Sequence, residues 1–169
     1  DKARVVFHWF LAPTLDEERA RADLMRWMAG NQTVKDLDRK ATLTSTSFEY
    51  FPIWYFKQRD ANGIETIHLL PGAATSVTEI EKMTLPAGDL RKYDQSIEAQ
   101  ARTPTVPLQA ATTWLSEASV PKDEIAEQFL VHVPLFTFKY NYRGNSFTAV
   151  VEAGTGRIFA NIYPAKAET

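Results

Sequence analysis

Histidine and serine are the side chains of this chain that could carry catalysis or bind a metal, and neither follows a catalytic pattern. The three histidines, His8, His68 and His132, fall in apolar segments typical of strands and are far apart in the sequence. A zinc site needs several such ligands to converge, so we expect no metal site and no cofactor. The chain has no cysteine and no G-x-S-x-G sequence, which excludes thiolate chemistry and the nucleophile elbow of hydrolases.

Aromatic side chains give a stronger signal, because one aromatic stretch occurs twice. Residues 50–57 return in altered form as residues 132–139, each with proline, an aliphatic residue, a large ring, one further residue, phenylalanine and lysine. In this alignment Tyr50 matches His132, and Trp54 matches Phe136. We predict that a ligand or partner binds between the two stretches, at Tyr50, Trp54, Phe56, His132, Phe136, Phe138 and Tyr140. The alternative is that these rings form a core, since burying one such ring stabilises a fold by about 1.5–3 kcal/mol.

The aromatic stretches lie between segments with clear helix and strand patterns. Thr14 and Glu17 form a capping box before a helix that buries Ala20, Leu24, Trp27 and Met28, and a second helix after Pro107 buries residues 110, 111, 114, 115 and 118. We expect a further, exposed helix at 87–101. The segments with β-branched and aromatic character predict strands at 4–11, 48–58, 64–70, 75–84, 129–142, 146–152 and 157–163.

The matched positions suggest an internal duplication. Trp114 lies 87 positions after Trp27, and Pro134 lies 82 positions after Pro52, so the offset is nearly constant through helix and strand. We therefore expect an α+β fold in which two helix plus antiparallel β-meander units form one compact domain. The predicted boundaries are a first repeat with an extra N-terminal strand at 1–84, a helical connector at 85–102 and a second repeat at 103–169.

Charge and hydropathy limit the kinds of partner. The formal net charge is −2, and a nucleic-acid-binding surface needs clustered basic residues, so we expect no nucleic-acid partner. No stretch of 18 apolar residues occurs, so no transmembrane segment is expected within the chain. Because residue 1 is aspartate rather than methionine and no signal-peptide pattern follows, we expect either a piece or a processed product of a longer protein. A protein or peptide partner fits the aromatic stretches best.

Two segments resemble known bacterial families. Residues 147–158, Phe-Thr-Ala-Val-Val-Glu-Ala-Gly-Thr-Gly-Arg-Ile, resemble the strand–turn–strand end of PepSY-type repeats. Residues 10–56 resemble uncharacterised bacterial proteins with an N-terminal zinc ribbon, a Y-x-P-x-W strand, here residues 50–54, and often a C-terminal membrane segment. The ribbon cysteines and the membrane segment are not in this sequence. The resemblance implies a binding or regulatory role at the cytoplasmic face of a bacterial membrane.

These observations favour a non-catalytic binding or assembly module of a larger, membrane-associated bacterial protein. The first alternative is an enzyme, hydrolase-like, with a histidine and a carboxylate in a cleft between the repeats. It requires His68 or His132 within hydrogen-bond reach of an acid or a nucleophile. The second alternative is a structural subunit of a complex, in which another chain covers the aromatic face.

Overall fold

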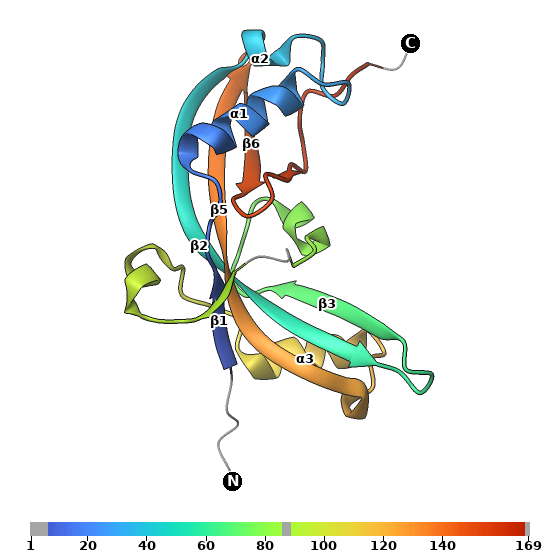
Figure 1. Cartoon of the computed structure of the whole chain (residues 1–169). Coiled ribbons are helices and arrows are strands. Elements are labelled where there is room, and N and C mark those ends of the chain that lie inside the picture. Colours follow the sequence, from blue (N-terminus) through green and yellow to red (C-terminus); the bar gives the residue numbers. More distant parts are fainter. Residues whose placement is uncertain (1–6, 86–88, 168–169) are drawn as a thin grey trace.

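Two long antiparallel strands form the middle of the structure, β2 (Thr42–Arg59) and β5 (Ile125–Tyr142), each of 18 residues (Figure 1). The computed structural model describes residues 7–85 and 89–167. The other strands extend this pair into one seven-stranded mixed sheet. They are β1 (Phe7–Leu11), β3 (Glu65–Pro71), β4 (Leu90–Lys92), β6 (Asn145–Glu152) and β7 (Ile158–Phe159).

On the outer edge of each long strand, different segments of the chain pair with different parts of the strand. Along β5, β1 pairs in parallel with the first half and β6 pairs antiparallel with the second half. Along β2, β3 pairs with residues 53–59, and a single bridge joins Tyr50 to Ala101. β4 then pairs with β1, and β7 with β6.

Helical segments are short and lie between the strands. They are α1 (Glu17–Met28), α2 (Leu37–Lys40), α3 (Leu108–Glu117) and the 3-10 turns η1 (Thr78–Lys82), η2 (Gln95–Gln100) and η3 (Lys122–Glu124). α1 is capped by Asp16, whose carboxylate accepts a hydrogen bond from the Arg19 amide at 2.9 Å. The capping box expected from Thr14 is therefore wrong.

The expected duplicated helix-plus-meander units are also wrong. The chain is mostly strand, and its strands belong to one sheet rather than to two meanders. α1 packs against residues of β5 and β6, including Phe138 and Val151, whereas α3 packs against Trp54 and Phe56 of β2. Because each helix covers strands that follow the other helix, neither predicted unit has its own core.

Several predicted elements differ from the observed ones as well. Residues 75–84 contain η1 and not a strand. The described part of 87–101 contains β4 and the 3-10 helix η2 in place of one continuous helix; residues 86–88 lie outside the described residues. The strand expected at 157–163 is limited to β7. In α3, Ala111 and Leu115 are buried, but Ala110 is exposed and Trp114 remains 36% exposed.

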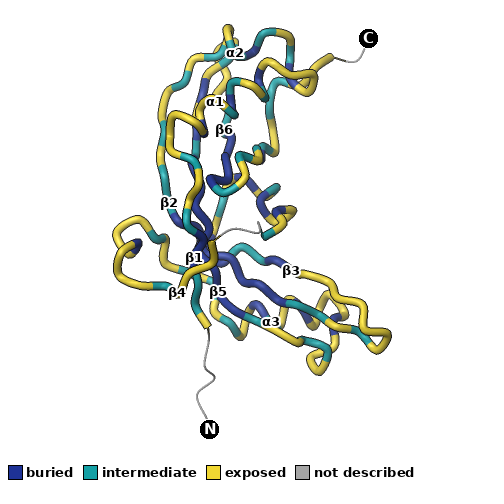
Figure 2. Tube along the Cα trace, viewed as in Figure 1, coloured by how far each residue is buried: buried dark blue, intermediate teal, exposed yellow. Residues whose placement is uncertain are grey.

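Buried residues are concentrated along the strands in the middle of the molecule (Figure 2). They form separate apolar clusters on the two faces of the sheet. Phe51 and Ile53 pack on one face with Val77 and Ile80 from the η1 segment. Neighbouring residues of β2 point to the opposite face, under α3. This double coverage explains why the sequence of β2 is apolar at nearly every position between 50 and 56.

Candidate functional site

The seven aromatic and histidine side chains predicted to bind a ligand are all buried, with no more than 7% of any residue exposed. They belong to different parts of the core. Trp54 and Phe56 lie under α3, whereas Phe136, Phe138 and Tyr140 lie under α1. Trp54 faces Leu130 across the ladder and Phe136 faces Phe48. Phe48 and Trp54 are six residues apart in β2, so the rings of Phe136 and Trp54 lie about 20 Å apart along the strand direction.

The structure does bring Tyr50 and Phe136 together. Both line a groove of about 590 Å³ at the N-terminal end of α1, which we call the aromatic groove. Its floor consists of Phe48, Tyr50 and Phe136, with ring centroids 5.1 Å apart for Phe48–Tyr50 and 4.7 Å apart for Phe48–Phe136. Residues 13–17, Arg19 and Gln100 form its walls.

A network around the turn after β6 positions the wall of the groove. The Ala153 carbonyl accepts hydrogen bonds from the amides of Thr14 and Leu15, both at 2.9 Å. The Thr14 hydroxyl donates to the Gly154 carbonyl at 2.7 Å. The turn is held in place by the buried Glu152 carboxylate, which accepts hydrogen bonds from the backbone amides of residues 154 and 155. The chain entering α1 is therefore fixed above the sheet.

The groove combines an aromatic floor with walls that carry polar and charged side chains, including Arg19 and Gln100. Burial raises the pKa of the Tyr50 hydroxyl, against the opposing charge of Arg91, so this phenol is neutral at pH 7 and can donate or accept a hydrogen bond. Asp16 is occupied as the helix cap, and Glu17 pairs with Arg21 at 3.0 Å. An aromatic floor with one phenol suits binding of an apolar or aromatic side chain.

A second hollow of about 430 Å³ lies between α3 and the start of β5. Thr112, Ser116, Lys122 and Glu127 contribute to its lining, and none of the seven predicted residues does. Its walls hold no aromatic ring. We therefore take the aromatic groove as the candidate site and the α3 hollow as a control region.

His132 lies in an arrangement that the sequence did not predict. Its Nδ1 lies 2.7 Å from His8 Nε2, and its Nε2 lies 2.8 Å from the Arg102 carbonyl oxygen. Because a carbonyl only accepts, His132 Nε2 donates to it, and His132 Nδ1 accepts from His8. The parallel pairing of β1 with β5 brings the two histidines together, and Tyr93 stacks on His8 with ring centroids 3.9 Å apart.

The histidine pair differs from the arrangement that a hydrolase requires. His132 contacts another histidine, and the Nε2 of His68 lies 2.8 Å from the side-chain oxygen of Gln58. In the described parts of the chain, no histidine hydrogen-bonds a carboxylate, and no three metal-ligating side chains are grouped. Burial, followed by the charge of His132, lowers the pKa of His8 to about 4, and burial lowers the pKa of His132.

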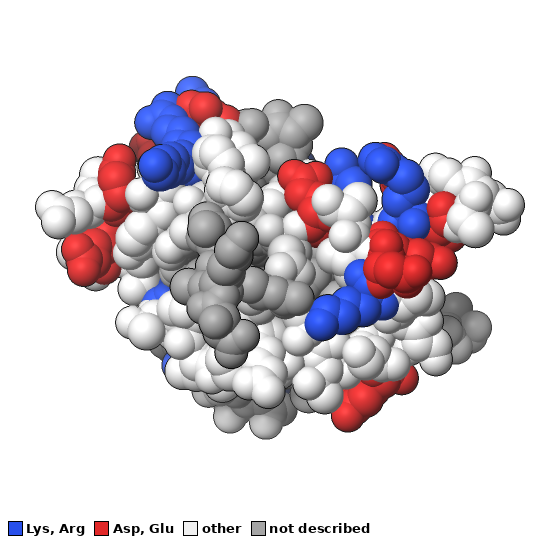
Figure 3. Space-filling view, turned by 90° about the horizontal axis from the view of Figure 1, so that it is seen from below, with Lys and Arg blue, Asp and Glu red and all other residues white. Residues whose placement is uncertain are grey.

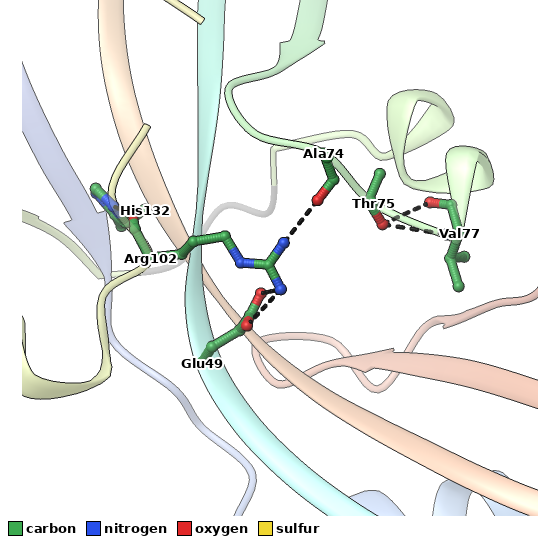
Figure 4. A network of polar contacts seen from close by, with 6 residues as sticks. All are labelled: Glu49, Ala74, Thr75, Val77, Arg102 and His132. Atoms are coloured by element: carbon green, nitrogen blue, oxygen red, sulfur yellow. Dashed lines mark hydrogen bonds and ion pairs between the residues drawn. The ribbon is translucent and has the colours of Figure 1, made fainter. Parts of the chain in front are cut away.

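Arg102 joins the histidine pair to the edge of β2 (Figure 4). Its guanidinium pairs with Glu49 at 2.7 Å, donates to the Ala74 carbonyl at 2.6 Å and lies over the Phe51 ring. Its backbone amide donates to the Tyr50 carbonyl at 3.0 Å. These contacts fix residues 101–102 beside Tyr50, at one end of the aromatic groove.

Acidic and basic side chains are interspersed on the face of the molecule seen in Figure 3. The ion pairs of the described residues include Arg59–Glu65 at 2.7 Å and Lys57–Glu127 at 3.3 Å. A surface of this kind does not concentrate the positive charge that binding to phosphate backbones needs.

The hydroxyl of Tyr140, one of the predicted site residues, should be dispensable for stability. This hydroxyl is buried without a hydrogen-bond partner among the described residues, and burial raises its pKa to about 12. A buried polar group without a partner costs stability, so Tyr140→Phe is expected to raise the free energy of unfolding by about 1 kcal/mol. Urea unfolding of the two proteins measures this. A clear loss of stability in the variant would mean that the hydroxyl has a partner.

Comparison with known proteins adds no family to this description. No protein-family model matches the chain, and no curated protein or solved structure is significantly similar to it. The resemblance to PepSY-type repeats therefore stays a prediction. Within residues 7–85 and 89–167, no helix has the length and apolar character needed to cross a membrane.

Proposed function

We propose that the protein is a non-catalytic binding module of a larger, membrane-associated bacterial protein, and that its binding site is the aromatic groove. The observation that carries the proposal is the floor of Phe48, Tyr50 and Phe136 in a groove of about 590 Å³. This volume lies in the range of sites that hold a small molecule or a few side chains. The single phenol and the amide of Gln100 would orient an occupant, and the rings would supply the apolar contact.

The two alternative functions receive less support. A hydrolase needs a histidine beside an acid or nucleophile, and the described histidines contact each other, a backbone carbonyl and an amide side chain. A structural subunit would have its aromatic strands covered by another chain, whereas α1 and α3 of the same chain cover most of these rings.

Titration with indole and with N-acetyl-phenylalanine amide, followed by NMR, tests the proposed site. We expect chemical-shift changes at the ring signals of Phe48, Tyr50 and Phe136. Phe48→Ala removes a floor ring that is only partly buried and should weaken probe binding by about tenfold, as expected for the loss of about 1–1.5 kcal/mol of ring contact. Thr113→Ala, an exposed change in the α3 hollow, is the matched control and should bind the probes unchanged.

The same proteins distinguish binding from catalysis. Hydrolysis of p-nitrophenyl acetate should proceed equally with the parent protein and with His132→Gln. Probe-induced shifts confined to the α3 hollow would contradict the site. An esterase rate that depends on His132 would favour the enzyme.

A further inference from the structure

The outer edge of β2 beside the aromatic groove has no strand partner among the described residues. β3 pairs only with residues 53–59, and Ala101 bridges only Tyr50. Between Thr42 and Glu49, the described residues provide no backbone hydrogen bond to this outer edge. β2 is the outermost strand in this part of the sheet (Figure 1). An open strand edge is a template for pairing with another chain.

The neighbouring hydrogen bonds show which backbone groups face outward. The carbonyl of Tyr50 accepts from Arg102, and that of Pro52 accepts from Gly72 at 2.8 Å, both on the side away from β5. In an antiparallel ladder the outward groups belong to every second residue. The amides and carbonyls of Phe48 and Thr46 therefore also point outward, while those of Ser47 point toward β5.

The regular part of this edge is short. The pairing with β5 shifts register between Leu43 and Ser45, which interrupts the edge at one end. Residues 101–102 occupy it at the other end, beside Tyr50. The remaining stretch from Ser45 to Glu49 is about 17 Å long. This length fits a segment of about five residues, and the register shift at one end and residues 101–102 at the other leave no room for a longer strand.

We propose that this edge accepts an extended peptide segment of a partner protein as an additional strand of the sheet. The inference rests on the proposed function and names its partner class. Phe48 and Tyr50 supply both the outward backbone groups and part of the groove floor, so every second side chain of the added strand lies on the same face of the sheet as the groove, beside these rings. Ser45 and Ser47 are exposed on the opposite face. The fitting peptide therefore alternates apolar or aromatic residues with polar ones.

The peptide acetyl-Lys-Thr-Phe-Thr-Val-Thr-Lys-amide is the probe, and Thr46→Pro is the decisive variant. Proline removes the outward amide of residue 46 but leaves the ladder to β5 intact. We expect Thr46→Pro to lower the affinity for the peptide by at least about tenfold, because one hydrogen bond is lost and the proline ring blocks the edge. Thr46→Val keeps the backbone amide and the β-branched side-chain shape, so it should bind the peptide within about twofold of the parent protein. Isothermal titration calorimetry measures the affinity of the peptide for the parent protein and for both variants.

Amide hydrogen exchange provides a second measurement that does not depend on a variant. Saturating peptide should slow exchange at Phe48 and Thr46 by about tenfold or more, because their amides become bonded, and should leave Ser47 unchanged. Equal binding to Thr46→Pro, or unchanged exchange at Phe48 in the bound state, would overturn the strand inference. Slowed exchange at Ile67 instead would assign the peptide to the edge of β3, and concentration-dependent slowing without peptide would assign the edge to a second copy.

The failures of the two proposals are distinguishable. If indole still shifts the floor rings while the peptide leaves the exchange of Phe48 unchanged, the groove binds side chains and the added strand is wrong. If neither probe affects Phe48, Tyr50 or Phe136, both the groove and the strand are wrong.

Discussion

Replacing Trp54 and Phe136 by leucine is expected to lower the free energy of unfolding by about 2 kcal/mol each and by about 4 kcal/mol together. Both side chains are buried, at 5% and 7% exposure. The Trp54 indole also donates to the Val106 carbonyl at 2.7 Å, and leucine leaves that carbonyl without its partner. The effects should add because the two rings lie in separate core clusters.

Binding of the indole probe separates the roles of these rings. Phe136 is part of the groove floor and Trp54 is not. Only Phe136→Leu should therefore weaken binding of the indole probe. Urea unfolding of the single and double variants measures the changes in the free energy of unfolding. A coupling energy above about 1 kcal/mol between the two sites, or weaker probe binding by Trp54→Leu, would mean that both rings belong to one site, as the sequence suggested.

Acidification is expected to destabilise the protein through the His8–His132 pair. Both pKa values are lowered in the folded state, that of His8 to about 4, mainly by burial. An unfolded histidine binds a proton below about pH 6.5, so the unfolded state holds more protons than the folded state between about pH 6.5 and 4. The contribution of the pair is therefore complete above about pH 6.5 and is lost as the pH falls toward 4. Because His8 is partly exposed and solvent screens its charge, we expect a loss of about 1–2 kcal/mol.

The double variant His8→Gln/His132→Gln separates the contribution of the histidine pair to acid destabilisation from that of carboxylate protonation. Its free energy of unfolding should fall less than that of the parent protein between pH 6.5 and 4. Thr113→Ala, a non-titrating change outside the pair, should keep the parent profile and serves as the control. Parallel profiles for the parent and the double variant would show that the pair does not govern the acid response.

The aromatic groove and the histidine pair meet at residues 100–102. Gln100 lines the groove, Ala101 bridges Tyr50, and the Arg102 carbonyl accepts from His132. Loss of the histidine contact at low pH therefore removes a support of the groove wall. The indole titration repeated at pH 4, near the lowered pKa of His8, should show weaker binding for the parent protein than at pH 7.5.

The sequence by itself determined the local elements, because their signals lie within a few residues. Ala20, Leu24 and Met28 recur at helical spacing and are buried in α1. The turn at Asn62-Gly63 requires a positive φ, and Gly63 adopts φ +79°. Residues 50–56 of β2 are apolar at successive positions, which is the pattern of a strand covered on both faces, and the structure covers both faces. The segment 75–84 also carried a correct signal that the strand prediction missed: Val77, Ile80 and Met83 are spaced by three, the period of a 3-10 turn, and all three are buried.

Only the tertiary structure decided which elements meet. His8 and His132 are 124 residues apart and come into contact because β1 pairs in parallel with β5. Phe48 and Phe136 share the groove floor because β2 and β5 pair in one register, while Trp54 lies six residues further along the same strand. Hydrophobic periodicity specifies that a face is buried but not which helix covers it or which strand edge stays open. Those choices depend on non-local pairing, and they place Tyr50 and Phe136 in the groove and leave Trp54 in the core.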